Sequence, residues 1–180
     1  MEITFQGNTR AREHITQVTL ARGIGWGLIG GLAGTLVMDF VLMGALSAVG
    51  LPALTCFSIV GNTAEHLFSI FGINIAGGVP IGIAAHYLVG PLFGFFFGAI
   101  LVKVDALRVD TLKKSIFFAV IYVEILSQPI LAATPVLLKM TAKDTLLWFG
   151  ASFVMHFLYG VVLGTVVSNG LRLANGTSYK

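Results

Sequence analysis

The chain has 180 residues, of which 56% are hydrophobic and 11% charged, and its formal net charge is +3. Soluble domains carry roughly 25% charged residues, so this composition excludes a soluble protein and indicates an integral membrane protein. About four or five crossings of roughly 20 residues fill the length, so we expect no separate catalytic domain and no enzyme activity from the chain alone. The basic residues lie in short clusters beside apolar runs, which indicates lipid headgroups and not nucleic acid as their partners.

The first 23 residues are polar and contain Arg10, Arg12 and Arg22. Within them, residues 11–22 fit either a short amphipathic helix on the membrane surface or a frayed tail. The apolar run that follows, at about 24–49, is longer than the roughly 7 to 15 apolar residues of a cleavable signal. The run therefore predicts a first membrane span that stays attached.

Four long apolar runs predict an all-α bundle of four transmembrane helices. The spans are expected at about 24–49, 80–102, 115–138 and 145–169, within a single transmembrane domain over 24–169. A shorter stretch at 57–72 carries its polar residues on one stripe of an amphipathic helix: Asn62, Glu65, His66 and Ser69. This stretch predicts a re-entrant or interfacial helix between the first two spans.

The placement of lysine and arginine favours four crossings over five, because these residues accumulate in cytoplasmic loops. With four crossings and a cytoplasmic segment 1–23, all but two basic residues lie inside: Arg10, Arg12, Arg22, Lys103, Arg108, Lys113, Lys114, Arg172 and Lys180. Only Lys139 and Lys143 lie outside, whereas five crossings divide the basic residues more evenly. We therefore predict a plasma membrane protein with both termini cytoplasmic, including the tail 170–180.

Two of the spans share a sequence pattern. Each has a histidine followed by glycines at four-residue spacing: His86, Gly90 and Gly94 in the second span, and His156, Gly160 and Gly164 in the fourth. Each follows a span with one acidic residue near its middle, Asp39 in the first and Glu124 in the third. The pattern indicates a duplicated two-helix unit in which an acidic helix precedes a histidine and glycine helix.

Small residues four positions apart lie on one helix face and let neighbouring helices approach closely. The glycines expected at such contacts are Gly27, Gly31, Gly90, Gly94, Gly98, Gly160 and Gly164. His86 and His156 continue the same stripes, so we expect their side chains to face inward. Tyr159 lies deep in the fourth span, where its hydroxyl is expected to bond one of the buried acids.

Ionisable groups inside a bilayer are energetically costly and usually mark function. The predicted site comprises Asp39, His86, His156 and Glu124, with Glu65 and His66 of the partial helix as further contributors. A rise of about 1.5 Å per residue places His86, Asp39 and His156 roughly 9, 15 and 17 Å deep, and Glu124 deeper at about 21 Å.

Three interpretations of this site remain open. Imidazole nitrogens and carboxylate oxygens are ligands for Zn, Cu or Fe, which favours an intramembrane metal site. The same groups relay protons or ions in transporters. The third interpretation, which we favour at this stage, is that they fix helix register in an accessory subunit of a larger membrane complex, such as a metalloenzyme or respiratory complex, or in a homo-oligomer.

The glycine-rich first span with Asp39, and the two His-x-x-x-Gly-x-x-x-Gly segments at 86–94 and 156–164, resemble the YagU-like group of small, largely uncharacterised prokaryotic integral membrane proteins. The resemblance extends over residues 25–168. It implies a four-helix inner-membrane protein, and no functional residues are carried over from it.

Overall fold

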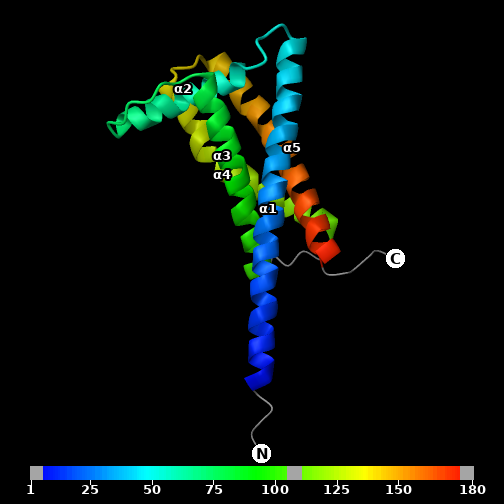
Figure 1. The fold of residues 1–180 in the computed structure, drawn as a ribbon. Helices are drawn as coiled ribbons and strands as arrows, with labels where there is room; N and C mark the ends of the chain where they lie inside the picture. Colours follow the sequence, from blue (N-terminus) through cyan, green and yellow to red (C-terminus); the bar gives the residue numbers. More distant parts are fainter. Residues whose placement is uncertain (1–5, 105–110, 175–180) are drawn as a thin grey trace, which may run out of the picture.

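The computed structural model describes residues 6–104 and 111–174, with side chains described over 20–104 and 111–172. All regular structure in this part of the chain is helical (Figure 1). The helices are α1 (Gln6–Ala48), α2 (Thr55–Ile70), α3 (Val79–Lys103), α4 (Leu112–Leu137) and α5 (Ala142–Ala174). Helix α1 includes residues 11–22, so these residues continue into the first span without a break.

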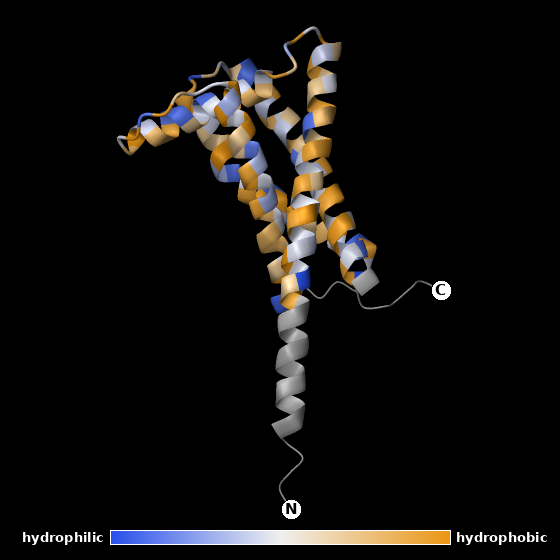
Figure 2. Cartoon of the chain, viewed as in Figure 1, coloured by the Kyte–Doolittle hydropathy of each residue, from blue (hydrophilic) through white to orange (hydrophobic). Residues whose placement is uncertain are grey.

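Four of the five helices are long and apolar enough to span a membrane, which confirms the predicted fold class. The spans are Leu20–Ala48, Val79–Lys103, Leu112–Leu137 and Ala142–Arg172. Apolar residues predominate along their length (Figure 2). Helix α2 is too short to cross and lies at one end of the bundle, directed away from it, as suits the partial helix predicted between the first two spans (Figure 1).

Helix α1 is the central element of the bundle. It packs against α3 and also against α5, while α4 packs mainly against α5, and α2 lies against α3 and α4. Alternate crossings make each of the pairs α1–α3, α1–α5 and α4–α5 antiparallel (Figure 1). Side chains from the first span can therefore meet side chains from both histidine-bearing helices.

Glycines form the contact between α1 and α3. Along the two antiparallel helices Gly23 meets Gly98, Gly27 meets Gly94, and Gly31 meets Gly90. A Cβ atom on any of these glycines except Gly90 would overlap the backbone of the opposite helix, and one on Gly90 would overlap the Thr35 side chain, so only glycine permits this approach.

The contact between α4 and α5 is also made by small residues. A Cβ atom on Gly160 would lie 2.7 Å from the Cα atom of Val120, and one on Gly164 would lie 2.7 Å from that of Ile116. The Ser115 hydroxyl donates a hydrogen bond to the Gly164 carbonyl at 2.8 Å, which ties the two backbones together. The predicted packing glycines thus lie at two helix contacts, α1–α3 and α4–α5.

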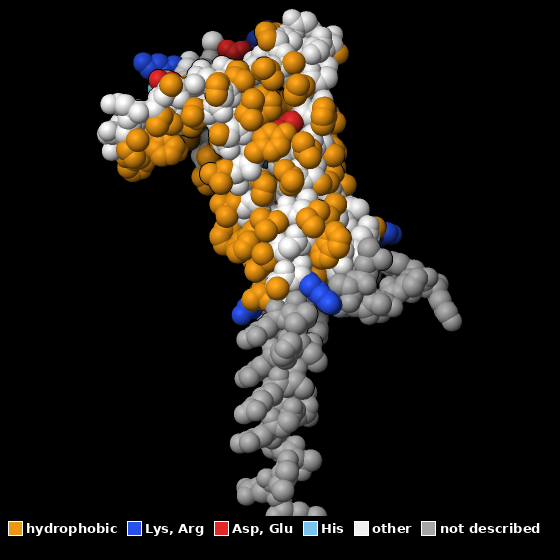
Figure 3. All heavy atoms as spheres, viewed as in Figure 1, with side chains coloured by type: hydrophobic (Ala, Val, Ile, Leu, Met, Phe, Trp, Pro, Cys, Tyr) orange, Lys and Arg blue, Asp and Glu red, His pale blue; other side chains and the backbone are white. Residues whose placement is uncertain are grey.

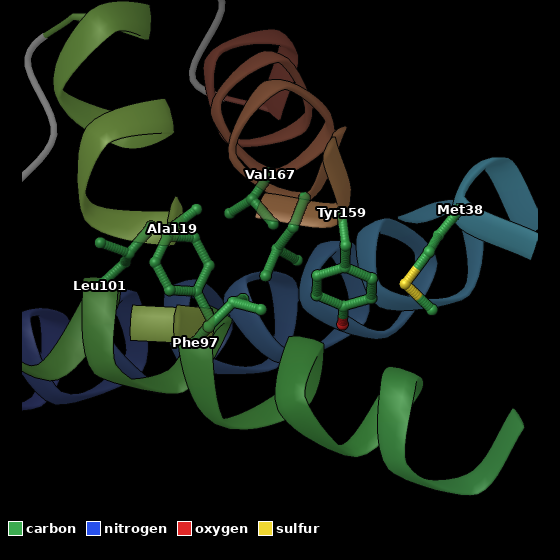
Figure 4. Close-up of a cluster of buried hydrophobic side chains, with 8 residues drawn as sticks. Met38, Phe97, Leu101, Ala119, Tyr159 and Val167 are labelled. Carbon is green, nitrogen blue, oxygen red and sulfur yellow. The ribbon is translucent and has the colours of Figure 1, made fainter. Parts of the chain in front are cut away.

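An apolar core fills the space between these helices. Figure 4 shows part of it, and its buried members are Met38, Phe97, Leu101, Ala119, Val123, Tyr159, Leu163 and Val167. The outer surface is also apolar, as for Phe40 of α1, which is 72% exposed. Figure 3 shows this apolar surface along the spans, with lysine and arginine confined to the two ends. Such a surface matches contact with a lipid bilayer.

Candidate acid and histidine site in the membrane

Asp39 lies on the same face of α1 as the contact glycines. Gly31, Thr35 and Asp39 follow one another at four-residue spacing, which keeps them on one helix face. The buried Thr35 hydroxyl donates to the Gly31 carbonyl at 3.0 Å and so needs no other partner. Beyond the glycine contact this face therefore brings the Asp39 carboxyl group against α3.

Asp39 and His86 form a direct pair within the membrane region. The distance from His86 Nδ1 to Asp39 Oδ1 is 3.0 Å, and the two side chains are 15% and 5% exposed. The second carboxylate oxygen, Asp39 Oδ2, is buried and has no hydrogen-bond partner among the described residues. The ring of Phe57 from α2 covers His86 edge-on, with 5.2 Å between ring centroids. The Asp39–His86 pair therefore lies in apolar surroundings, and Asp39 Oδ2 accepts no hydrogen bond from the described residues.

Two further titratable groups interact with the charge of Asp39. They are Cys56 at the start of α2 and Tyr87 of α3. Burial, and then the nearby Asp39 charge, raise the pKa of the Cys56 thiol to about 12. A thiol with so high a pKa is a poor nucleophile at neutral pH, because the thiolate is the reactive form.

Cys56 should accordingly resist alkylation. We expect maleimide to label it at least tenfold more slowly at pH 8 than a Cys56→Ser, Ser69→Cys variant, whose thiol lies on the exposed part of α2. The raised pKa also means that the rate should keep rising above pH 9, where the rate of an exposed thiol levels off. Mass spectrometry of timed samples measures both rates, and equal rates would contradict this burial.

His156 is the second histidine drawn into the site. Its Nδ1 atom is buried without a hydrogen-bond partner among the described residues, and its charge interacts with that of His86. The Tyr159 hydroxyl donates to the Gly90 carbonyl at 2.6 Å, so the predicted bond from Tyr159 to a buried acid is wrong. One turn before these two residues lie His156 and His86, so the bond places both histidines at one level of the bundle.

Glu124 carries the second unsatisfied carboxyl group. Both of its carboxyl oxygens are buried and lack a hydrogen-bond partner among the described residues. Because Gly164 meets Ile116 and Gly160 meets Val120, the next turn of these antiparallel helices sets His156 opposite Glu124. The pairing of α4 with α5 thus places Glu124 at the level of His156, whereas counting along the sequence placed it deeper.

Glu65 and His66 lie apart from this group. They follow Phe57 by about two helical turns along α2, toward the loop that leads into α3. The carboxylate of Glu65 lies beside Gly77, and the exposed ring of His66 bonds the Asn62 carbonyl at 2.9 Å. The structure therefore brings Asp39, His86 and His156 together, sets Glu124 opposite His156, and leaves Glu65 and His66 in a separate polar group.

The donor set does not match a metal site. Within the described parts of the chain, which include all six candidate residues, no group of three or more histidine, cysteine or acidic side chains is arranged to hold a metal ion. A structural or catalytic site for Zn or a related ion needs at least three protein ligands. The geometry thus offers proton-binding groups and no ready cation cage.

Comparison with known proteins finds no matching family model, and neither a curated protein nor a solved structure matches the chain. The resemblance to the YagU-like group therefore stays a prediction. The helix bundle and its side chains are what the functional argument rests on.

Proposed function

We propose that this small polytopic membrane protein binds protons inside the membrane and transfers them through the Asp39–His86 pair. The observation that carries this proposal is the 3.0 Å contact between His86 Nδ1 and the buried Asp39 Oδ1. A carboxylate buried in an apolar region is stabilised when a proton lies between it and a second basic group.

The chemistry of transfer needs no other reactant. When the second ring nitrogen of His86 takes up a proton, the proton on Nδ1 can move to Asp39 Oδ1, which leaves a neutral imidazole beside a neutral carboxyl group. Release of the carboxyl proton and reorientation of the ring return the pair to its starting state. One proton enters and one leaves in each cycle.

Proton flux into liposomes tests this proposal. Purified protein in vesicles that contain a pH-sensitive dye should acidify the lumen when a potassium diffusion potential drives protons inward. We expect Asp39→Asn or His86→Asn to lower that flux at least tenfold, since each substitution removes a group that must change protonation.

Two matched controls remove the same chemical groups elsewhere. Asp144→Asn deletes an acid outside the paired site, near the start of α5, and His66→Asn deletes an exposed imidazole of α2. Both should retain wild-type flux. Flux in the wild type no greater than in protein-free vesicles, or unchanged flux in Asp39→Asn, would refute the proposed function.

We propose that the end of the bundle where α3 ends and α4 begins faces the cytoplasm. Five of the described basic residues lie at this end: Arg22, Lys103, Lys113, Lys114 and Arg172. Lys139 and Lys143 lie at the other end, and the remaining basic side chains, of Arg10, Arg12, Arg108 and Lys180, are outside the described residues. The excess of positive charge supports cytoplasmic termini in a plasma membrane.

A role as an accessory subunit, with a homo-oligomer or other membrane proteins as partners, stays a prediction beside this proposal. It is compatible with proton transfer, because subunits of respiratory-type complexes also need paths for protons. Migration in native gels, compared with the 19.1 kDa mass of the chain, tests it.

A further inference from the structure

The α4–α5 half of the bundle contains two buried titratable groups that lack hydrogen-bond partners among the described residues. These groups are the carboxyl group of Glu124 and the Nδ1 atom of His156. An unpaired buried polar group costs free energy, and each one in a native structure needs an explanation, such as a catalytic role or a bound water or ion. Two such groups at one level of one helix contact need a common explanation.

The packing of α4 against α5 indicates which way both groups face. Ile116, Val120 and Glu124 occupy one stripe of α4, and the first two contact the glycines Gly164 and Gly160 of α5. The same stripe of α5 continues by one turn to His156. At the two preceding turns of this contact the backbones of α4 and α5 touch. Glu124 and His156 therefore occupy the next turn of the same contact.

This arrangement parallels the α1–α3 half. There, His86 precedes Gly90 by one turn and pairs with an acid of the antiparallel neighbour, Asp39. In the second half, His156 precedes Gly160 by one turn and is opposite an acid of its neighbour. The two halves differ in register. Gly31 meets Gly90, and Asp39 lies two turns beyond Gly31. Val120 meets Gly160, and Glu124 lies only one turn beyond Val120.

We propose that Glu124 and His156 form a second proton-binding pair, the counterpart of Asp39 and His86, and that the two pairs exchange protons across the bundle through the histidines. This inference rests on the proposed function and specifies its route. A proton leaves the Glu124 carboxyl group for the His156 imidazole, which gives a carboxylate and an imidazolium. The imidazolium then passes a proton toward His86, and Asp39 accepts the proton displaced there.

The groups around His156 are suited to this exchange. Glu124 is opposite it on α4, His86 of α3 is at its level, and the Tyr159 hydroxyl is already engaged by the Gly90 carbonyl. Asp39 lies behind His86 on α1, and Tyr122 of α4 donates to the Phe93 carbonyl at 3.0 Å. Tyr122 and Tyr159 are thus held by backbone carbonyls, whereas Tyr87 and Cys56 interact with Asp39 and not with His156, so the acids and histidines are the groups that connect the two pairs.

Infrared titration of the reconstituted protein tests the coupling without requiring transport. The carbonyl stretch of each protonated carboxyl group disappears as that group ionises, and Glu124→Gln identifies the band of Glu124. We expect His156→Asn to raise the midpoint of that band by at least about one pH unit, because the imidazole that accepts the carboxyl proton in the pair is then absent. The control His66→Asn should leave the midpoint where it is.

Disulfide formation tests the geometry separately. In a Cys56→Ser background, Glu124→Cys with His156→Cys should form a disulfide under mild oxidation, since bridged Cα atoms must lie within about 7 Å. Glu124→Cys with Phe157→Cys is the matched control, because Phe157 is the next residue of α5 and is 48% exposed on the outer surface. Absence of the first disulfide would overturn the proposed pairing, and a disulfide without the infrared shift would overturn the proton coupling.

Flux separates this inference from the proposed function. If Asp39→Asn abolishes flux while Glu124→Gln and His156→Asn retain it, the second pair is not on the route and the first pair still conducts. If all three variants lose flux at least tenfold while Asp144→Asn retains it, the route across both pairs is supported.

Discussion

Gly27→Ala should separate α1 from α3 and destabilise the bundle by about 1–3 kcal/mol, the range observed when atoms are forced into a packed contact. A Cβ atom on Gly27 would overlap the carbonyl oxygen of Gly94, and a backbone oxygen cannot rotate away as a side chain can. The only relief is a shift of one helix. Because Gly94 and its neighbours hold the whole contact, the shift should extend to Asp39 and His86.

A second substitution on the same helix provides the control. Gly44 has nothing within 4 Å of the position where a Cβ atom would lie, so Gly44→Ala meets no obstacle. Alanine favours helix over glycine by up to about 1 kcal/mol, so this variant should be as stable as the wild type or slightly more stable. Unfolding in mixed micelles of increasing denaturing detergent compares the variants. Equal stabilities for both variants would show that α1 and α3 are less closely packed than described.

The sequence alone predicts the four spans well, because a bilayer requires long, continuous apolar helices and leaves few alternatives. The glycine stripes also point to helix contacts, since four-residue spacing defines one face. Sequence periodicity cannot tell which two stripes meet. That Gly27 meets Gly94, and Gly160 meets Val120, depends on the order in which the helices pack.

The sequence specifies the site less completely than the fold, because the order of the helices also decides which side chains meet. Asp39 and His86 are residue types that mark function within a span, so both could be identified from the sequence. Phe57, which covers His86, comes from α2, whose position against α3 follows from no spacing rule. Tyr159 was expected to bond an acid, but the close approach of α3 leaves the Gly90 carbonyl within its reach. Depth counted along one helix likewise ignores the stagger between helices, which only the packing of α4 against α5 defines.

His86→Ala should destabilise the protein by about 3 kcal/mol at pH 8, because it leaves the Asp39 carboxylate buried without a partner. The double variant Asp39→Leu, His86→Leu should lose less than His86→Ala alone at pH 8, because replacing both members of a buried polar pair by apolar side chains is often neutral or stabilising.

The single variant should lose more stability than the double variant because the Asp39–His86 pair is buried. A hydrogen bond between membrane helices contributes only about 0.6 kcal/mol on average, so the intact pair adds little to stability. The large free-energy cost comes from burying a charge that has no partner, and Asp39 as a whole residue is only 4% exposed. Unfolding free energies of the wild type, Asp39→Leu, His86→Leu and the double variant at pH 8 form a thermodynamic cycle. A cost for His86→Ala of only about 0.6 kcal/mol would contradict this account, because the His86 contact would then be an ordinary hydrogen bond between helices.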